Sequence, residues 1–364
     1  LTYVVMRLAE SKVRPVRHAA VATGLHIVEA VCNRLASVKR SIDNCERMLD
    51  GAKGRRKAGL KETIQEHSEQ YDGLRKVIQA VLERKLIRAD DISAPIRCEC
   101  YTALRRLSDA GSSMFVTSDT WNEFLKFGLA DKDNVVRIKA LEVLEEWFSK
   151  PQCFNNAKSI LVAHSVGKFV FQCCRLTEPS VIRVAGLKVV LHMLSLDPQA
   201  LDDESFTECA EFVWSSDKHV ASAAASVVNA HALGEPLLSK VDCGDNIHNM
   251  KIMENQLRTI AEFMESYGEQ EGKTLWFWNS RFYEAFYDKV ACLSSWLAIT
   301  NLILLGETHQ SEIATNQGYK KTYILILEAA SKHAVAHAQR DQNRAVDAVH
   351  VVLKRIPEML ERWQ

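Results

Sequence analysis

A short motif recurs along this chain, and the recurrence constrains the fold more than any other feature does. Each copy has an acidic or polar turn, then Val or Ile followed by Arg, then small residues, then Leu at helical spacing. The copies contain Arg17, Arg97, Arg137 and Arg183, and a degraded fifth copy has Ala221 in place of the arginine. A period of about 40 residues with two helices per unit is typical of HEAT and armadillo arrays. The pattern therefore predicts an all-α fold, a HEAT-repeat α-solenoid (α-α superhelix).

The turn ahead of each repeating arginine carries residues that suit the start of a helix. Carboxylates can cap free N–H groups there, and proline is tolerated in a first turn. The acids are Asp131, Glu178 and Asp217, and the prolines are Pro15, Pro95 and Pro179. We interpret the repeating arginines as a structural ladder, each paired with a turn carboxylate of its own or an adjacent repeat. Direct contact with a ligand is the alternative.

The interval between the first two arginines is twice the usual period. Apolar residues in steps of three and four from Leu25 to Leu49 predict one long helix over Val16–Asp50. A second apolar seam predicts another helix over Leu60–Arg88, after a break of glycine and basic residues at 51–59. The sequence thus predicts a long antiparallel helical hairpin, about residues 20–88, inserted in the array and projecting from it.

The break between the two predicted helices is strongly basic. The chain holds 46 basic and 46 acidic residues, so a nucleic-acid surface has to be a local patch. The tip of the hairpin is the first candidate for contact with DNA phosphates, and a merely solvated helix tip is the alternative. Its cations are Lys53, Arg55, Arg56, Lys57 and Lys61, with no acid between Gly51 and Lys61. The second candidate surface consists of Lys126, Arg137 and Lys139.

The repeats divide the chain into two parts. Residues 1–233 are expected to form the HEAT repeats with the hairpin, and 250–364 further HEAT-like helices. The stretch 234–249 is the best candidate for a linker, because glycine, proline and Asp gather there.

The sequence gives no reason to expect an enzyme, a metal site or a cofactor. Residues Gly268–Thr274 resemble a phosphate loop but have one residue too few between the glycines and follow a helix, so they are read as a connecting loop. The ten cysteines have neither zinc-site nor disulfide-framework spacing, which favours a reducing compartment. The uncharged run Val290–Gly306 is read as a buried helix and not as a membrane span.

The first repeat, Val13-Arg-Pro-Val-Arg-His-Ala-Ala20, resembles the opening of the stromalin conservative domain. A repeat interrupted at this point by a long hairpin with a basic middle is similar to the stromal antigen (stromalin) family, the HEAT-repeat subunit of cohesin. The segment Ser118–Leu144 follows the same family pattern. The resemblance implies binding to a kleisin subunit, sequence-independent contact of basic surfaces with double-stranded DNA, and a groove for short peptides of regulators such as shugoshin and the insulator protein.

The resemblance also implies which residues line that groove. An Arg-His pair of the family matches Arg17 and His18, and an acidic residue matches Asp119. Phe127 stands at a groove tryptophan, while two positions depart from the family: Val166 replaces an aromatic and Glu123 a lysine. On a helix, Trp121, Phe124 and Leu125 share one face, and Phe127 lies off it. Phe127 is therefore either an exposed anchor for a peptide or a plug in the joint with the next repeat.

The favoured function is a non-catalytic scaffold subunit of a cohesin complex, located in the nucleus on chromatin. It would bind kleisin, DNA and regulator peptides in sister chromatid cohesion and chromosome organisation, with no membrane and no small-molecule substrate. The alternative is a HEAT-repeat adaptor that binds only proteins, in transport or signalling. Affinity for DNA separates the two.

Overall fold

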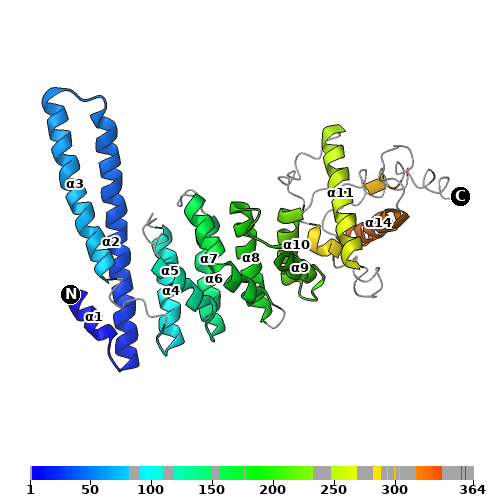
Figure 1. Ribbon diagram of the computed structural model, residues 1–364, viewed down its shortest axis with the longest axis horizontal. Coiled ribbons are helices and arrows are strands. Elements are labelled where there is room, and N and C mark those ends of the chain that lie inside the picture. The colour runs from blue at the N-terminus through cyan, green and yellow to red at the C-terminus, as the bar shows by residue number, and fades with distance from the viewer. Residues whose placement is uncertain are drawn as a thin grey trace. The chain divides into compact units, whose positions relative to one another are not determined.

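The computed structural model describes residues 2–81, 90–109, 119–149, 156–175, 178–232, 247–268, 282–287, 293, 299–300, 303, 317–337, 354 and 357. Within these ranges the regular elements are helices and no strand occurs (Figure 1). This confirms the all-α prediction. The chain divides into two compact units, Leu1–Ala200 and Leu201–Gln364.

The first unit opens with a short helix and a long hairpin and continues with five shorter helices. In chain order these are α1 (Thr2–Ala9), α2 (Arg14–Leu49), α3 (Gly54–Val81), α4 (Ala94–Asp109), α5 (Asp119–Leu129), α6 (Asn134–Ser149), α7 (Asn156–Cys174) and α8 (Ser180–Leu196).

The hairpin consists of α2 and α3, which lie side by side along their length (Figure 1). The predicted seam of α2 is buried from Leu25 to Cys45 at every predicted position, and Leu49 at its end is half-buried. The α3 seam is only half-buried until Ile78, because α3 packs chiefly on α2. Helix α3 begins at Gly54, six residues before the predicted start, so the basic tip residues belong to its first turns. Its predicted end at Arg88 lies outside the described residues.

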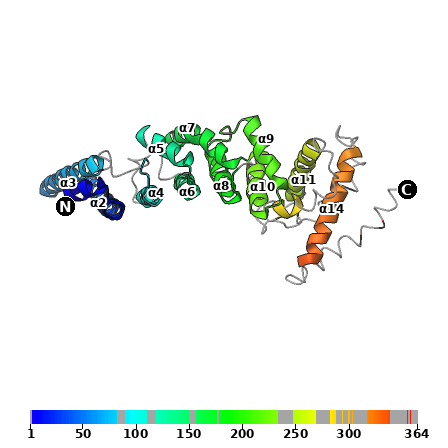
Figure 2. The ribbon, with the colours of Figure 1, turned by 90° about the horizontal axis from the view of Figure 1, so that it is seen from below.

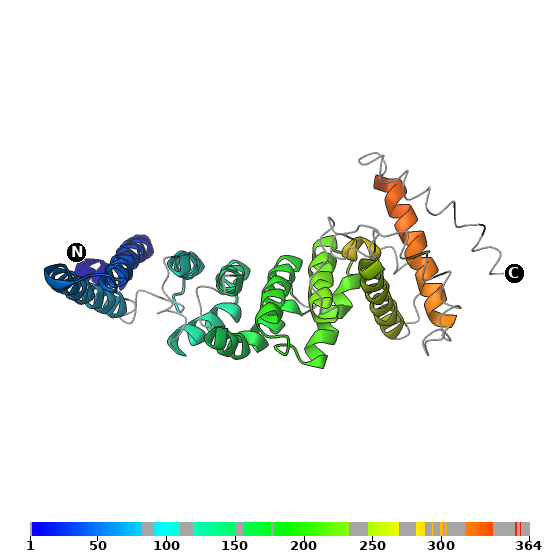
Figure 3. The same cartoon turned by 90° about the horizontal axis from the view of Figure 1, so that it is seen from above.

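The remaining helices of the first unit form two layers. Helices α2, α4, α6 and α8 contact one another in series, and α5 and α7 pack beside each other in the second layer (Figure 2). Figure 3 shows the same arrangement from the opposite side. Helices α7 and α8 approach closely at Gly186, where a Cβ would lie 2.7 Å from Cys174 Sγ. The small residue that follows the repeating arginine therefore permits close packing of the two helices.

The second unit contains α9 (Asp203–Glu211), the 3-10 helix η3 (Phe212–Trp214), α10 (Lys218–Ala232), α11 (Ile247–Gly268) and α14 (Gln317–His337). The rings of Trp214 and Phe263 stack with centroids 5.7 Å apart, which joins η3 to α11. The compact units therefore divide after Ala200, whereas the sequence placed the boundary at 234–249. Residues 247–249 are helical, and the rest of that stretch lies outside the described residues.

Candidate DNA-binding and peptide-binding surfaces

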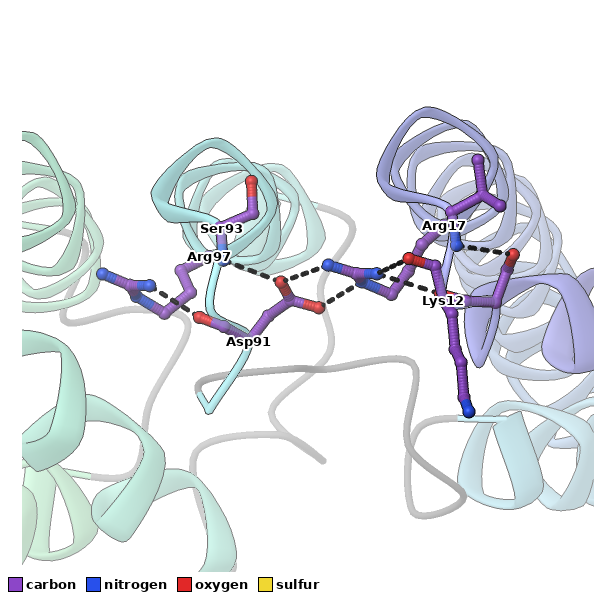
Figure 4. Close-up of polar contacts among 7 residues, drawn as sticks. Lys12, Arg17, Asp91, Ser93 and Arg97 are labelled. Atoms are coloured by element: carbon purple, nitrogen blue, oxygen red, sulfur yellow. Dashed lines mark hydrogen bonds and ion pairs between the residues drawn. The ribbon is translucent and has the colours of Figure 1, made fainter.

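The first two repeating arginines meet at one carboxylate-bearing turn (Figure 4). Arg17 of α2 donates from Nε to Asp91 Oδ2 at 2.7 Å and from Nη2 to Asp91 Oδ1 at 3.2 Å. Its Nη1 donates to the carbonyl oxygen of Ser11 at 2.9 Å. Arg97 of α4 donates to the carbonyl oxygen of Asp91 at 2.6 Å. The turn before α4 is thereby held by an arginine on either side.

The pattern continues along the layer with two further pairs. Arg97 contacts Asp131 through two parallel bonds, Nε to Oδ2 at 2.7 Å and Nη2 to Oδ1 at 2.8 Å. Arg137 of α6 donates from Nη2 to Glu178 Oε2 at 2.6 Å. The carboxylate partners raise the pKa of both guanidinium groups, so the arginines remain charged. The ladder interpretation is confirmed for these pairs and for Arg17.

Two of the candidate binding residues belong to the ladder. The Arg17 and Arg137 side chains are each only 14% exposed, and each is engaged by a carboxylate. Both side chains therefore lie mostly beneath the surface. All three guanidinium nitrogens of Arg17 donate hydrogen bonds within the protein, and Arg137 is engaged through Nη2, so neither charge is uncompensated.

The tip of the hairpin carries a different kind of cation. Lys53, Arg55, Arg56, Lys57 and Lys61 are all exposed, and none of them forms an ion pair within the described part of the chain. Three of them occupy the first turn of α3, where the helix dipole is positive and a cation costs roughly 0.3–1 kcal/mol. These charges therefore do not stabilise the start of α3, and no carboxylate of the described residues pairs with them.

The second DNA candidate is electrostatically neutralised. Lys126 Nζ lies 2.8 Å from Glu123 Oε1, and Lys139 Nζ lies 2.8 Å from Glu142 Oε2. Together with the engaged Arg137, these pairs leave little positive potential at this surface. The structure thus favours the tip over the second candidate.

The predicted groove is only partly assembled. Phe124 and Leu125 are buried, whereas Phe127 is 64% exposed, so the alternative that Phe127 plugs a joint between repeats is wrong. Val166 is 0% exposed, because α7 packs between α5 and α8 and turns this residue inward. Val166 therefore belongs to the core and cannot line a surface pocket.

The other groove candidates have mixed settings. His18 is half-buried, and Glu123 is exposed but paired with Lys126. Asp119 begins α5, and its side chain lies outside the described residues. The exposed Phe127 is thus the one aromatic anchor among the predicted groove residues.

The sequence analysis missed three further exposed apolar side chains beside the ladder. Ile92, Val135 and Val181 are 92%, 55% and 63% exposed, and they lie in the turns or first helical turns next to the ladder. Val135 and Val181 stand two places before an arginine of the repeat, which is the signal that could have revealed them.

The described residues contain neither a candidate metal site nor a candidate membrane span. No group of His, Cys, Asp and Glu in them could hold a metal ion. None of the helices described is long and apolar enough to cross a bilayer.

Comparisons with known proteins agree with the fold and the first repeats. Residues 1–70 match the STAG domain family model. A solved structure of the cohesin subunit Scc3 from Z. rouxii, residues 88–1035, is similar with a TM-score of 0.73 and 15% identity. The match covers 95% of this chain and 42% of the Scc3 chain, which confirms a HEAT-like helical solenoid. None of the curated proteins matches the sequence significantly. Residues 1–70 are therefore similar to the STAG domain, and the chain shares the helical solenoid fold of that cohesin subunit.

Proposed function

We propose that this chain is a non-catalytic scaffold of a cohesin complex, acting on chromatin in the nucleus in sister chromatid cohesion and chromosome organisation. Its proposed partners are a kleisin subunit, double-stranded DNA and short regulator peptides of shugoshin or insulator-protein type. The STAG domain at residues 1–70 and the likeness to a cohesin subunit support this assignment.

The observation that carries the proposal is the uncompensated charge at the hairpin tip. Exposed cations without carboxylate partners suit the phosphate backbone, which carries charge but no sequence information. Binding at the tip is therefore sequence-independent. If all five cations contact phosphates, the slope of log affinity against log salt is about −4.5, at about −0.9 per phosphate. A HEAT adaptor that binds only proteins has no such requirement for its surface.

The test compares two charge reversals of equal size on the same helix. Arg55→Glu/Arg56→Glu alters the tip, and the control Arg75→Glu/Lys76→Glu alters exposed residues toward the other end of α3. Duplexes of two unrelated sequences are titrated at several salt concentrations. The tip variant is expected to lose affinity and flatten the salt slope by about 2 for both duplexes, while the control keeps most of both. If both variants bind like the original protein, the DNA surface is not at the tip.

A second partner surface is proposed around Phe127. Short peptides commonly bind by one or two aromatic contacts and a polar rim, and Phe127 with the nearby Lys126 provides such an arrangement. Synthetic peptides of shugoshin and insulator-protein type are the probes. Phe127→Ala is expected to weaken the best of them by about 2 kcal/mol with the melting temperature nearly unchanged. Val181→Ala, at another exposed apolar residue, is the matched control. Equal loss in both variants contradicts the site.

The kleisin proposal rests on the STAG domain match at residues 1–70 and on the helical array shared with a cohesin subunit. Affinity purification of the tagged full-length protein from nuclear extract is expected to recover a kleisin together with the coiled-coil ATPases of cohesin. Recovery of transport or signalling proteins without a kleisin would support the adaptor function instead.

A further inference from the structure

Tyr101 of α4 occupies the space that a side chain at position 128 of α5 would need. A Cβ on Gly128 would lie 2.4 Å from both Cζ and the hydroxyl oxygen of Tyr101. Ordinary contact between such atoms begins near 3.4 Å, so even alanine is about 1 Å too large. Because Gly128 has no side chain, the end of α5 packs closely against the ring of Tyr101 on α4.

The ring of Tyr101 cannot easily move aside. Its hydroxyl donates to the carbonyl oxygen of Phe124 at 2.7 Å, and the two rings stack with centroids 4.5 Å apart at 26°. The side chain is 1% exposed. Phe124 lies one helical turn before Gly128. Tyr101 therefore holds α5 at two points of the same face, one turn apart.

Phe127 directly precedes Gly128 and is 64% exposed. Because 100° of helical rotation separates these neighbours, the face that carries Gly128 against Tyr101 leaves the ring of Phe127 outside. We propose that Tyr101 and Gly128 are positioning residues of the peptide-binding surface, which set the height of the last turn of α5 and hence the direction of Phe127. This inference rests on the peptide binding proposed above.

The contact between Tyr101 and Gly128 matters because a binding site tolerates only a small displacement of its residues. A recognition surface works only when its anchors are held within roughly 0.5 Å of the productive geometry. A side chain at position 128 would displace the last turn of α5 by about 1 Å, twice that tolerance. Phe127 is 64% exposed, so its own packing is too sparse to correct the shift.

The experiment measures peptide affinity in variants that create and then relieve the clash. The probe is the tightest-binding peptide of the shugoshin and insulator-protein panel, in fluorescence polarisation with the full chain. Gly128→Ala is expected to lose affinity by about tenfold. Gly128→Ala/Tyr101→Leu is expected to regain affinity to within about threefold, because leucine lacks the ring atoms that collide. Should Gly128→Ala fail to fold, Tyr101→Phe removes only the hydroxyl bond and is expected to lose about threefold.

The matched control is Gly186→Ala, which meets Cys174 Sγ in the same unit at a different helix pair. It is expected to lower the melting temperature while peptide affinity stays within about twofold. Retention of affinity by Gly128→Ala despite a lower melting temperature would overturn the positioning role, and so would failure of the double variant to recover.

A second readout needs no peptide. With 4-fluorophenylalanine incorporated at position 127, the fluorine resonance is expected to shift in Gly128→Ala and to return in the double variant. If no peptide binds the original protein, the proposed peptide binding fails, and this resonance still decides the positioning role. An unshifted resonance in Gly128→Ala overturns it.

Discussion

The ion pair of Arg97 with Asp131 permits the sharpest test of how the repeats are held together. The two side chains are 5% and 8% exposed, and two parallel bonds of 2.7 and 2.8 Å join them. Replacing Arg97 by Met removes these bonds and the bond to the carbonyl oxygen of Asp91, and it leaves the carboxylate buried without its counter-charge. Breaking a buried pair in this way costs about 3–5 kcal/mol.

A second substitution should restore part of the lost stability, because most of the loss comes from the unpaired charge of Asp131. Arg97→Met/Asp131→Asn removes that charge and keeps an oxygen for the bond from the Asp133 N–H, which is 2.8 Å long in this structure. We expect the double variant to be more stable than Arg97→Met by about 1–3 kcal/mol. Arg7→Met is the control, since the Arg7–Glu10 contact is 3.9 Å long between side chains 68% and 44% exposed. Such surface pairs contribute about 0–1 kcal/mol.

Urea unfolding followed by circular dichroism measures the three free energies, and hydrogen exchange locates the loss. Exchange should rise in α4, which carries Arg97, and at the start of α6, which follows the turn of Asp131, and it should rise less in the α2–α3 hairpin. The reasoning is refuted if Arg97→Met costs no more than Arg7→Met, or if the double variant is as unstable as Arg97→Met.

Three further predictions concern the hairpin, the thiols and a helix cap. Leu35→Asp places a charge in the buried seam of α2 and is expected to destabilise the hairpin by about 2–4 kcal/mol. Hydrogen exchange should therefore rise in α2 and α3 but not in α8. Uniform loss of protection would contradict a separate hairpin. Burial raises the pKa of Cys32 to about 12 and that of Cys173 to about 11, so at pH 8 iodoacetamide should label neither in the folded protein, and rapid labelling of both would refute this. Asp202 caps α9 by accepting from the Ser205 N–H at 2.7 Å, which lowers the pKa of its carboxyl. The cap therefore stabilises α9 above the ordinary pKa of 3.8, and this stabilisation is lost as pH falls through the lower pKa of the folded protein. Hydrogen exchange at the start of α9 should therefore rise in acid. Asp202→Ala should abolish that pH dependence.

The sequence by itself determined the helical repeat, the ladder and the seam of α2. These features depend on local spacing: a period of three and four residues selects one face of a helix, and a carboxylate or proline before an arginine marks where the helix begins. The partner of Arg17 shows the limit of that reasoning. Its carboxylate belongs to Asp91, 74 residues later, and only the return of the chain after the hairpin brings the two together.

The tertiary structure alone decided which side chains remain at the surface. Periodicity placed Phe127 off the buried face of α5 but could not say whether another helix covers it, and the structure leaves it exposed. Val166 is buried because α7 has neighbours on both sides. The fit of Tyr101 against Gly128 joins two helices whose contact no local pattern encodes. A helical period specifies which direction a side chain takes from its own helix, whereas burial depends on the neighbouring helices that fill that direction.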